Sequence, residues 1–423
     1  MTRPTVCQVL HSLGIGGAEV LAAEIARRLS DRYRFVFACL DSLGTFGKQL
    51  VREGFRVEVL NRQPGLDWRC AFRLAKFQRE ERVAVTHAHQ YTPFFQALLG
   101  RLSYRRPPIV FTEHGRHYPD QRSSKRVLFN RSLIRQDDRF FGVGHAVSAA
   151  LIANEGLPEH RVECIYNGVD LAPFAAVAQH EALRTEVRRE LGLTANEFVV
   201  LQVARLNPLK DHLTALRAIE RLAARGIPAK LVLAGDGEER SKIEDFVSSH
   251  GLAQRVVLLG ARRDVPRLMA AADVFLLSSI SEGIPLTFIE AMSAALPIVA
   301  TDVGGCAEVV LHGETGWLAP AQDDNQLASH LESLQRDSLQ RRQFGLAGAA
   351  RAHELFSLDR MLAEYSAVYD SLLGQRSIAL STPAATEPSS PRHNALSLNQ
   401  LEREVRPSRE DSSPAASLTR SPH

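Results

Sequence analysis

The chain is poor in cysteine and has no long apolar run, and both absences restrict what it can be. Its 423 residues include five cysteines, which are scattered and form no C-x-x-C pair. This usage predicts neither a disulfide framework nor a zinc site, and it favours a reducing cytoplasm. No stretch approaches the roughly 20 apolar residues that span a bilayer, so we expect any membrane contact to be peripheral.

The start of the sequence also lacks a charged segment followed by an apolar one. MTRPTVCQVLHSLG leads directly into a predicted strand, and this pattern is not that of a secretory signal. The expected location is the cytoplasm, with the inner face of the membrane as the alternative.

The net charge is small, but it is unevenly distributed. A formal charge of +3 is too low to predict nucleic-acid binding by the whole protein. Residues 101–139 nevertheless hold ten basic residues against four acidic ones. The basic residues are Arg101, Arg105, Arg106, Arg116, Arg122, Lys125, Arg126, Arg131, Arg135 and Arg139. Such a face could contact anionic lipid or a polyprenyl diphosphate acceptor, and a solvated surface helix is the alternative.

Length and pattern predict two domains of the α/β class. A chain of this length exceeds the usual size of one hydrophobic core. Short apolar runs alternate with longer amphipathic segments, as in parallel α/β sheets. The predicted strands of the first domain, residues 1–175, read TVCQVL, YRFVFACL, FRVEVL, VAVTHAH, PIVFTEH, DRFFGVG and RVECIYN. Those of the second, residues 185–357, read FVVLQVA, AKLVLAG, VVLLG, VFLLS and PIVATD.

Two segments of different character follow the second domain. Residues 358–374 contain LDRMLAEYSAVYDSLL and are predicted to form a terminal helix. Residues 376–423 are rich in Ser, Pro, Thr and Ala. That composition cannot bury enough apolar surface to offset chain entropy, so we expect a disordered tail.

Two glutamates mark the most informative stretch. Glu282 and Glu290 flank a predicted helix start at Pro285, and the strand VFLL (274–277) precedes them. A strand that runs into a helix N-terminus makes an anion site, because free N–H groups and the helix dipole point at the ligand. Carboxylates beside such a site suit the hydroxyl groups of ribose or a hexose. The stretch therefore predicts a sugar-nucleotide site.

A pair of cations follows the first strand of the second domain. Arg205 and Lys210 lie in the loop after FVVLQVA. A guanidinium fork and an ammonium group at the end of a strand can bind several oxygens of a diphosphate. The neighbouring Asp211 would weaken that site if it pointed inward, so we expect it to point outward or to cap the next helix.

A glycine-containing loop follows the first strand of the chain. Gly14, Gly16 and Gly17 allow backbone amides to approach an anion or a sugar closely. The segment is not G-x-G-x-x-G, because Glu19 stands where the last glycine would be. A dinucleotide cofactor is therefore disfavoured.

In matching order, these segments resemble the motifs of the retaining glycosyltransferases of family 4. SEGIPLTFIEAMSAALPIVATDVGG is similar to the E-x7-E signature of that family, and VARLNPLKDHLTAL to its phosphate-binding segment. HSLGIGGAE is similar to its glycine loop, and IYNGVD (165–170) to its interdomain segment. The resemblance implies the GT-B fold: two Rossmann-like domains whose parallel sheets face a cleft, with a C-terminal helix that crosses back to the first domain.

The resemblance also implies roles for single residues. Glu282 and His114 are the predicted catalytic residues, and both would face the donor sugar. Glu290 would bind the ribose hydroxyls, and Thr287 the distal phosphate. The predicted donor-binding residues are Gly16, Gly17, Arg205, Lys210, Thr287 and Glu290. His87 and His89, in THAHQ, are expected to be structural.

The implied activity transfers a hexosyl-type group, with retention, from a nucleoside-diphosphate sugar to a hydroxyl of a saccharide or lipid-linked acceptor. The setting would be bacterial cell-surface or exopolysaccharide biosynthesis. No cofactor or metal is expected, because the two cations and a helix N-terminus can stabilise a leaving diphosphate. Two alternatives stay open: a sugar-nucleotide epimerase on the same fold, and a catalytically silent scaffold that binds sugar nucleotides.

Overall fold

The computed structural model describes residues 3–14, 16–104, 107–115 and 121–381 and contains two parallel β-sheets. The first sheet has the strand order β3-β2-β1-β4-β5-β6-β7 and the second β10-β9-β8-β11-β12-β13. The strands of the first sheet are β1 Thr5–Ser12, β2 Arg34–Ser42, β3 Arg56–Val59, β4 Val83–His89, β5 Ile109–Glu113, β6 Arg139–Gly142 and β7 Val162–Cys164. Those of the second are β8 Phe198–Val203, β9 Ala229–Ala234, β10 Val256–Leu258, β11 Val274–Leu277, β12 Ile298–Thr301 and β13 Gly316–Ala319.

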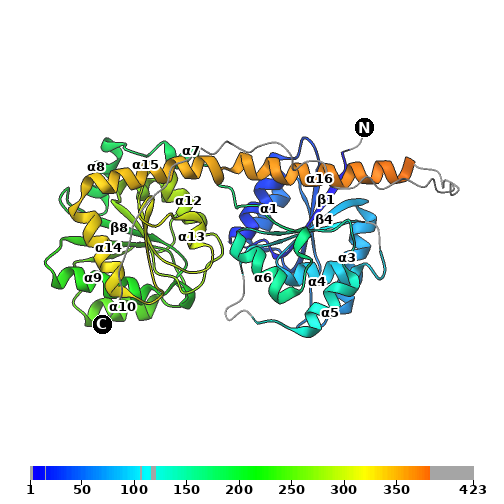
Figure 1. Cartoon of the computed structure of the whole chain (residues 1–423), viewed down its shortest axis with the longest axis horizontal. Helices are drawn as coiled ribbons and strands as arrows, with labels where there is room; N and C mark the ends of the chain where they lie inside the picture. Colours follow the sequence, from blue (N-terminus) through cyan, green and yellow to red (C-terminus); the bar gives the residue numbers. More distant parts are fainter. Residues whose placement is uncertain (1–2, 15, 105–106, 116–120, 382–423) are drawn as a thin grey trace, which may run out of the picture. The chain divides into compact units, whose positions relative to one another are not determined.

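Helices connect the strands and cover both sheets (Figure 1). Around the first sheet they are α1 Gly17–Arg28, α2 Gly44–Arg52, α3 Trp68–Glu80, α4 Tyr91–Gly100, α5 Ser124–Leu133 and α6 His145–Glu155. Next come α7 Ala172–Ala175, α8 Glu181–Glu190, α9 His212–Ala224, α10 Arg240–Ser249, α11 Val265–Ala271, α12 Leu286–Ser293 and α13 Cys306–Val309. The last three are α14 Asp324–Arg336, α15 Ser338–Leu355 and α16 Leu358–Ser381.

The central strands are buried on both faces, because helices cover each side of a parallel sheet. In β2, every residue from Phe35 to Leu40 is buried. Cys7 and Cys39 are fully buried on β1 and β2, where their thiols pack as small apolar groups of the core. All five cysteines are free thiols.

The strand order places a ligand crevice in each domain. The order 3-2-1-4-5 reverses between β1 and β4, and the second sheet reverses at the corresponding point between β8 and β11. In open parallel sheets, ligands bind outside the carboxyl ends of the strands at such a switch point. The loops after β1, β4, β8 and β11 therefore lie at the two switch points.

The helix α16 packs on the first sheet, although it follows the second in sequence (Figure 1). Tyr369 Oη contacts His87 Nδ1 at 2.7 Å, and Tyr33 Oη donates to Asp370 Oδ1 at 2.6 Å. Just before α16, Ser357 pairs with Val169 in an isolated β-bridge. The chain therefore passes between the two domains twice at neighbouring points, and the predicted return of the terminal helix is confirmed.

Several predictions differ from the structure in detail. The strand β13 was not predicted, because GWLA is short and lacks an alternating pattern. Pro285 is the N-cap of α12 and not its first helical residue. The helix α16 runs past 374 and includes 376–381, the first part of the predicted disordered tail. Residues 382–423 lie outside the described residues, and the predicted domain limits at 175, 185 and 357 stay predictions.

Among the described residues, no helix combines the length and the apolar character needed to cross a membrane.

Candidate functional site

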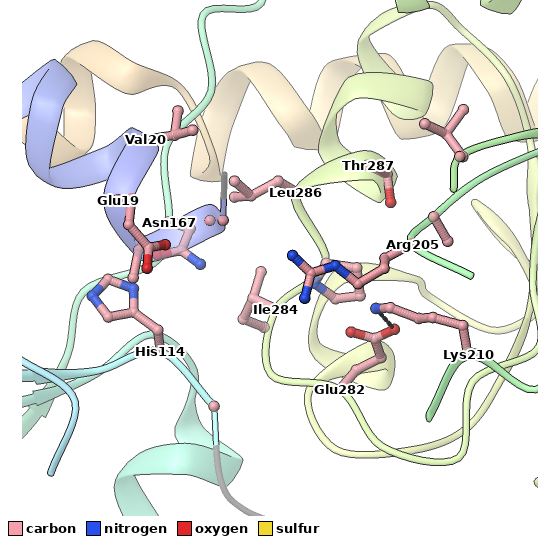
Figure 2. Close-up of a pocket in the computed structure, with 18 of the residues that line it drawn as sticks. Glu19, Val20, His114, Asn167, Arg205, Lys210, Glu282, Ile284, Leu286 and Thr287 are labelled. Atoms are coloured by element: carbon pink, nitrogen blue, oxygen red, sulfur yellow. Dashed lines mark hydrogen bonds and ion pairs between the residues drawn. The ribbon is translucent and has the colours of Figure 1, made fainter. Parts of the chain in front are cut away.

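Loops at the carboxyl ends of both sheets line one cavity of about 1010 Å³. Figure 2 shows cationic side chains on one of its walls and Glu19 and His114 on the other. The predicted site residues all line this cavity: Gly16, Gly17, His114, Arg205, Lys210, Glu282, Thr287 and Glu290. Segments separated by more than 200 positions in the sequence thus meet at one place.

The cationic wall belongs to the second domain. Arg205 follows β8, and Lys210 ends the short 3-10 helix Pro208–Lys210. The Lys210 ammonium forms an ion pair with the Glu282 carboxylate, which also accepts a hydrogen bond of 2.6 Å from Ser279 Oγ. This partly buried pair fixes the direction of both side chains, and Figure 2 shows Arg205 beside it, directed into the cavity.

The loop that carries Glu282 depends on a glycine opposite it. Gly304 has a φ of +55°, which lies in a backbone region that residues other than glycine rarely adopt. A Cβ atom on Gly304 would lie 1.9 Å from the backbone oxygen of Glu282. Only a residue without a side chain lets the two loops approach this closely, so Gly304 sets the position of Glu282.

The helix α12 directs its N-terminus at the same cavity. Pro285 is its N-cap, and Thr287 lies in its first turn. The first N–H groups of a helix lack intrahelical partners and attract an anion. One turn further on, burial raises the pKa of the Glu290 carboxyl to about 7. The wall therefore offers donors for phosphate oxygens beside a carboxyl group suited to hydroxyls.

Asp211 does not point at this cationic wall, and this agrees with the expectation from the sequence. It lies in the left-handed region with φ +41° and caps α9, and its carboxylate accepts hydrogen bonds from the backbone N–H and the hydroxyl of Thr214. Its charge is therefore directed at a helix N-terminus, and the predicted capping role is confirmed.

Two buried histidines of β4, His87 and His89, lie behind the opposite wall, next to His114. His114 follows β5 and lines the cavity, and its Nε2 lies 2.8 Å from Nδ1 of His89 on β4. Burial lowers the pKa of His114 to about 3. Burial and the neighbouring histidines also lower the pKa values of His87 and His89 well below the usual range. All three rings are neutral near pH 7.

Glu19 is a cavity residue that the sequence did not single out for a role. It lies in the first turn of α1, and its carboxylate folds back over the N-cap, so that a Cβ on Gly16 would lie 2.3 Å from Oε2. Burial raises the pKa of Glu19, and the charges of His11 and Arg205 oppose that rise. Gly16 therefore makes room for the Glu19 carboxylate, whereas the sequence suggested that an anion or a sugar approaches there. The position at N3 of a glycine-led helix was the available signal.

A second cluster of polar groups also escaped prediction. One ligand atom from each of His145, Cys164 and Glu308 lies within 4.8 Å of the other two. The Glu308 carboxylate accepts hydrogen bonds of 2.6 and 2.7 Å from the N–H groups of His145 and Ala146. Because α6 begins there, the free N–H groups of its first turn stabilise this carboxylate. Among the described residues, no such metal-type grouping occurs in the cavity itself.

Two family models match this chain. The model described as "Glycosyl transferases group 1" matches residues 184–351, and the model described as "Glycosyltransferase Family 4" matches residues 15–173. The first match covers every strand of the second sheet, and the second covers the described cavity loops of the first.

Named glycosyltransferases and a related synthase are similar in sequence to this chain over most of their own length. The N-acetyl-alpha-D-glucosaminyl L-malate synthase of Bacillus anthracis is 26% identical over 371 residues, which are 85% of this chain and 95% of the relative. The UDP-Gal:alpha-D-GlcNAc-diphosphoundecaprenol alpha-1,3-galactosyltransferase of Escherichia coli is 27% identical over 64% of this chain and 72% of the relative.

Solved structures agree with the sequence comparisons. A glycosyltransferase from Rickettsia africae ESF-5 has a TM-score of 0.79 and 19% identity, and the match covers 88% of this chain and 99% of that one. Anabaena HepE, solved in complex with UDP and glucose, has a TM-score of 0.75 and 24% identity over 86% of this chain and 99% of that one. The two family models together span both sheets, and these structures share the architecture; the chain is a glycosyltransferase that has the GT-B fold and is similar to family 4.

Proposed function

We propose that this enzyme transfers a hexosyl-type group, with retention, from a nucleoside-diphosphate sugar to a hydroxyl of a saccharide or lipid-linked acceptor. The observation that carries the proposal is the cavity, in which Arg205, Lys210 and the α12 N-terminus face one space. A diphosphate needs such a set of donors, and the carboxyls of Glu282 and Glu290 beside it suit sugar and ribose hydroxyls.

The proposed chemistry is a substitution at the anomeric carbon. The bond from C1 to the diphosphate oxygen breaks, and a bond from C1 to the acceptor oxygen forms on the same face. The acceptor proton passes to an oxygen of the departing phosphate. Arg205, Lys210 and the N–H groups of α12 stabilise the negative charge that develops there, and because they are already in place, little reorganisation is needed. We propose no metal ion for this step.

Two similar proteins suggest a donor and an acceptor for this enzyme. The Escherichia coli relative is named for a UDP-sugar donor and a diphosphoundecaprenol acceptor, and Anabaena HepE was solved with UDP and glucose. We therefore propose a UDP-sugar as donor and a polyprenyl-diphosphate saccharide as acceptor, within cell-surface or exopolysaccharide biosynthesis. The enzyme would work in the cytoplasm, at the inner face of the membrane.

Thermal unfolding in the presence of UDP-, GDP- and ADP-sugars tests the donor site. A ligand at 100 times its Kd stabilises the folded state by about 2.7 kcal/mol, which shifts the Tm measurably. We expect one class of nucleotide to give a shift that is lost in Lys210→Ala and Glu290→Gln. Lys242→Ala is the matched control, because Lys242 also pairs with a glutamate, Glu239, but lies on the surface of α10. A folded protein that responds to none of the donors would support the silent-scaffold alternative.

We also propose a peripheral contact with anionic lipid through part of the basic segment 101–139. Arg101 does not contribute, because it is buried and paired with Asp138. Arg105, Arg106 and Arg116 lie outside the described residues. On and beside α5, the exposed basic residues are Arg122, Lys125, Arg131 and Arg135. Leu128 is 70% exposed among them, and a lipid surface could take up such an apolar group together with the cations.

Sedimentation with vesicles tests this contact. We expect binding to vesicles that contain phosphatidylglycerol, weaker binding at high salt, and a several-fold loss in Lys125→Glu/Arg131→Glu. The control is Arg336→Glu/Arg342→Glu, a double charge reversal at exposed residues of the second domain. Equal binding to neutral phosphatidylcholine vesicles, or an equal loss in the control, would contradict the proposed face.

A further inference from the structure

Three side chains with the chemistry of metal ligands meet outside the cavity. One ligand atom from each of His145, Cys164 and Glu308 lies within 4.8 Å of the other two. None of the three residues lines the cavity, so the cluster is separate from the donor site. No local spacing in the sequence indicates it, because the residues lie far apart in the chain.

The cluster draws its members from both domains. His145 begins α6 and Cys164 ends β7, and both of these elements belong to the first domain. Glu308 lies in α13, which connects β12 to β13 of the second sheet, 163 positions after His145. An ion held by all three side chains therefore ties the two domains together.

Hydrogen bonds fix the direction of the Glu308 carboxylate. Its Oε2 accepts from the N–H of His145 at 2.6 Å and from Tyr166 Oη at 3.2 Å. Its Oε1 accepts only from the N–H of Ala146, at 2.7 Å. A carboxylate has about four lone-pair positions, so one position on Oε1 remains for an ion. Metal-binding carboxylates are usually held by outer hydrogen bonds of this kind.

The other two ligand atoms are available. Among the described residues, neither the ring nitrogens of His145 nor the thiol of Cys164 has a hydrogen-bond partner. The edge of the His145 ring packs on Tyr166 with centroids 5.8 Å apart, and this contact restricts the ring. Cys164 is partly exposed, whereas the other four cysteines are buried. It is thus the cysteine that an ion from solution can reach.

The distances and the kinds of atom suit zinc. Zn²⁺ binds imidazole nitrogen, thiolate sulfur and carboxylate oxygen, and two ligand atoms of a tetrahedral site lie roughly 3.5 Å apart. Atoms within 4.8 Å of one another need to approach by little more than about 1 Å. Mg²⁺ and Ca²⁺ prefer oxygen ligands alone. Thiolate and carboxylate balance the charge of Zn²⁺, so the α6 N-terminus faces no net positive charge.

We propose that His145, Cys164 and Glu308 bind one zinc ion that joins the two domains. The Cys164 thiol releases its proton to the solvent as the Zn–S bond forms, and a water molecule takes the fourth position. The ion is structural and has no part in the transfer step. The inference is independent of the proposed function, because none of its tests needs a substrate.

Cobalt(II) is the spectroscopic probe for this site. A thiolate that binds Co²⁺ gives a charge-transfer band in the near ultraviolet. We expect this band in the full-length chain, its removal by an excess of Zn²⁺, and its loss in Cys164→Ser. Cys70→Ser is the matched control, because it removes a buried thiol of α3 and should keep the band. A wild type without the band, or an unchanged band in Cys164→Ser, would overturn the proposal.

Calorimetric titration with Zn²⁺ tests the other two ligands. We expect one ion per chain and a loss of affinity of about ten-fold or more in His145→Ala and in Glu308→Gln. The control is His353→Ala, which removes an exposed histidine from α15 and should bind Zn²⁺ as the wild type does. An equal loss in this control, or several weak sites in the wild type, would overturn the site and indicate an adventitious ion only.

The bridge between the domains has its own test in Glu308→Gln. This substitution keeps an oxygen for the N–H groups of α6 but removes the charge that binds the ion. If Zn²⁺ binds this variant as tightly as the wild type, the ion belongs to the first domain alone and the bridge is refuted. Thermal unfolding gives a second readout: Zn²⁺ should raise the Tm of the wild type but not that of Cys164→Ser. An unchanged Tm in the wild type would contradict the joining role.

Discussion

The surroundings of Glu290 set its pKa, and this pKa should make the affinity of the cavity for its ligand depend on pH. Burial raises the pKa of this carboxyl to about 7, whereas an exposed glutamate ionises near pH 4. A carboxylate accepts hydrogen bonds from both hydroxyls of a ribose, whereas a protonated carboxyl accepts fewer. The ionised form is thus the one that we expect to bind the donor.

We predict that the affinity for UDP-glucose rises with pH through this range. A group with a pKa near 7 is about one-tenth ionised at pH 6 and about nine-tenths ionised at pH 8, so the Kd should fall roughly ten-fold. UDP-glucose is the appropriate ligand, because its diphosphate carries no group that titrates near pH 7. Isothermal titration calorimetry at several pH values measures the effect. In Glu290→Gln the Kd should be higher and nearly constant with pH; a retained slope would assign the titration to another group.

Single residues differ in how far the sequence could reveal them. Arg205, Lys210, Glu282 and Glu290 lie in loops after strands or close to a helix start, and this pattern together with the resemblance to family 4 predicted them as site residues; all four line the cavity. Glu19 and the hydrogen bonds that link His114 to His89 and His89 to Gln8 were not predicted. Gln8, His89 and His114 lie on or after three different strands, and their contacts depend on the order β1-β4-β5, which the sequence does not specify residue by residue.

Among the elements, two loops at strand ends approach each other closely at the site. The loop after β11 carries Glu282, and the loop after β12 contributes Gly304, whose backbone lies against it. The alternation of apolar runs and amphipathic segments predicted twelve of the thirteen strands that the structure describes. The close approach of these two loops is a tertiary feature, and no periodicity in the sequence indicates it.

We predict that Gly304→Ala strongly destabilises the protein. Alanine is strained at φ +55°, and its Cβ would overlap the backbone oxygen of Glu282. The loss in the free energy of unfolding should exceed about 3 kcal/mol, as for other severe backbone conflicts, and urea denaturation measures it. Gly251→Ala is the control, because Gly251 has a similar φ of +66° with no atom within 4 Å of its added Cβ. Strain alone should cost about 1 kcal/mol there, and equal losses would refute the role of the close approach.

In the molecule as a whole, the C-terminal helix α16 completes the core of the N-terminal domain. Its apolar face, from Leu358 to Leu372, joins the core cluster that contains Phe35, Phe37 and Phe141. Its tyrosines add hydrogen bonds to this apolar contact, and one of them reaches the histidine that stacks on His89. The helix α16 thus supports the buried histidines behind this wall of the cavity.

We predict that Tyr369→Phe costs about 1–3 kcal/mol in the free energy of unfolding. The substitution keeps the buried ring but leaves Nδ1 of His87 without its partner in a dry site. Chemical denaturation measures the loss, and a double-mutant cycle with His87→Phe isolates the pair. If the two losses simply add, the hydrogen bond contributes nothing to stability.

The route of α16 also governs the order in which this enzyme can mature during translation. The residues of the first sheet emerge from the ribosome long before Leu358 is synthesised. Until then, the apolar surface that α16 covers has no helix packed on it. The first domain therefore stays incomplete, with its chain still attached to the ribosome, while the whole second domain is synthesised. A nascent chain that stops after the second sheet would carry every predicted site residue and still lack a finished first domain.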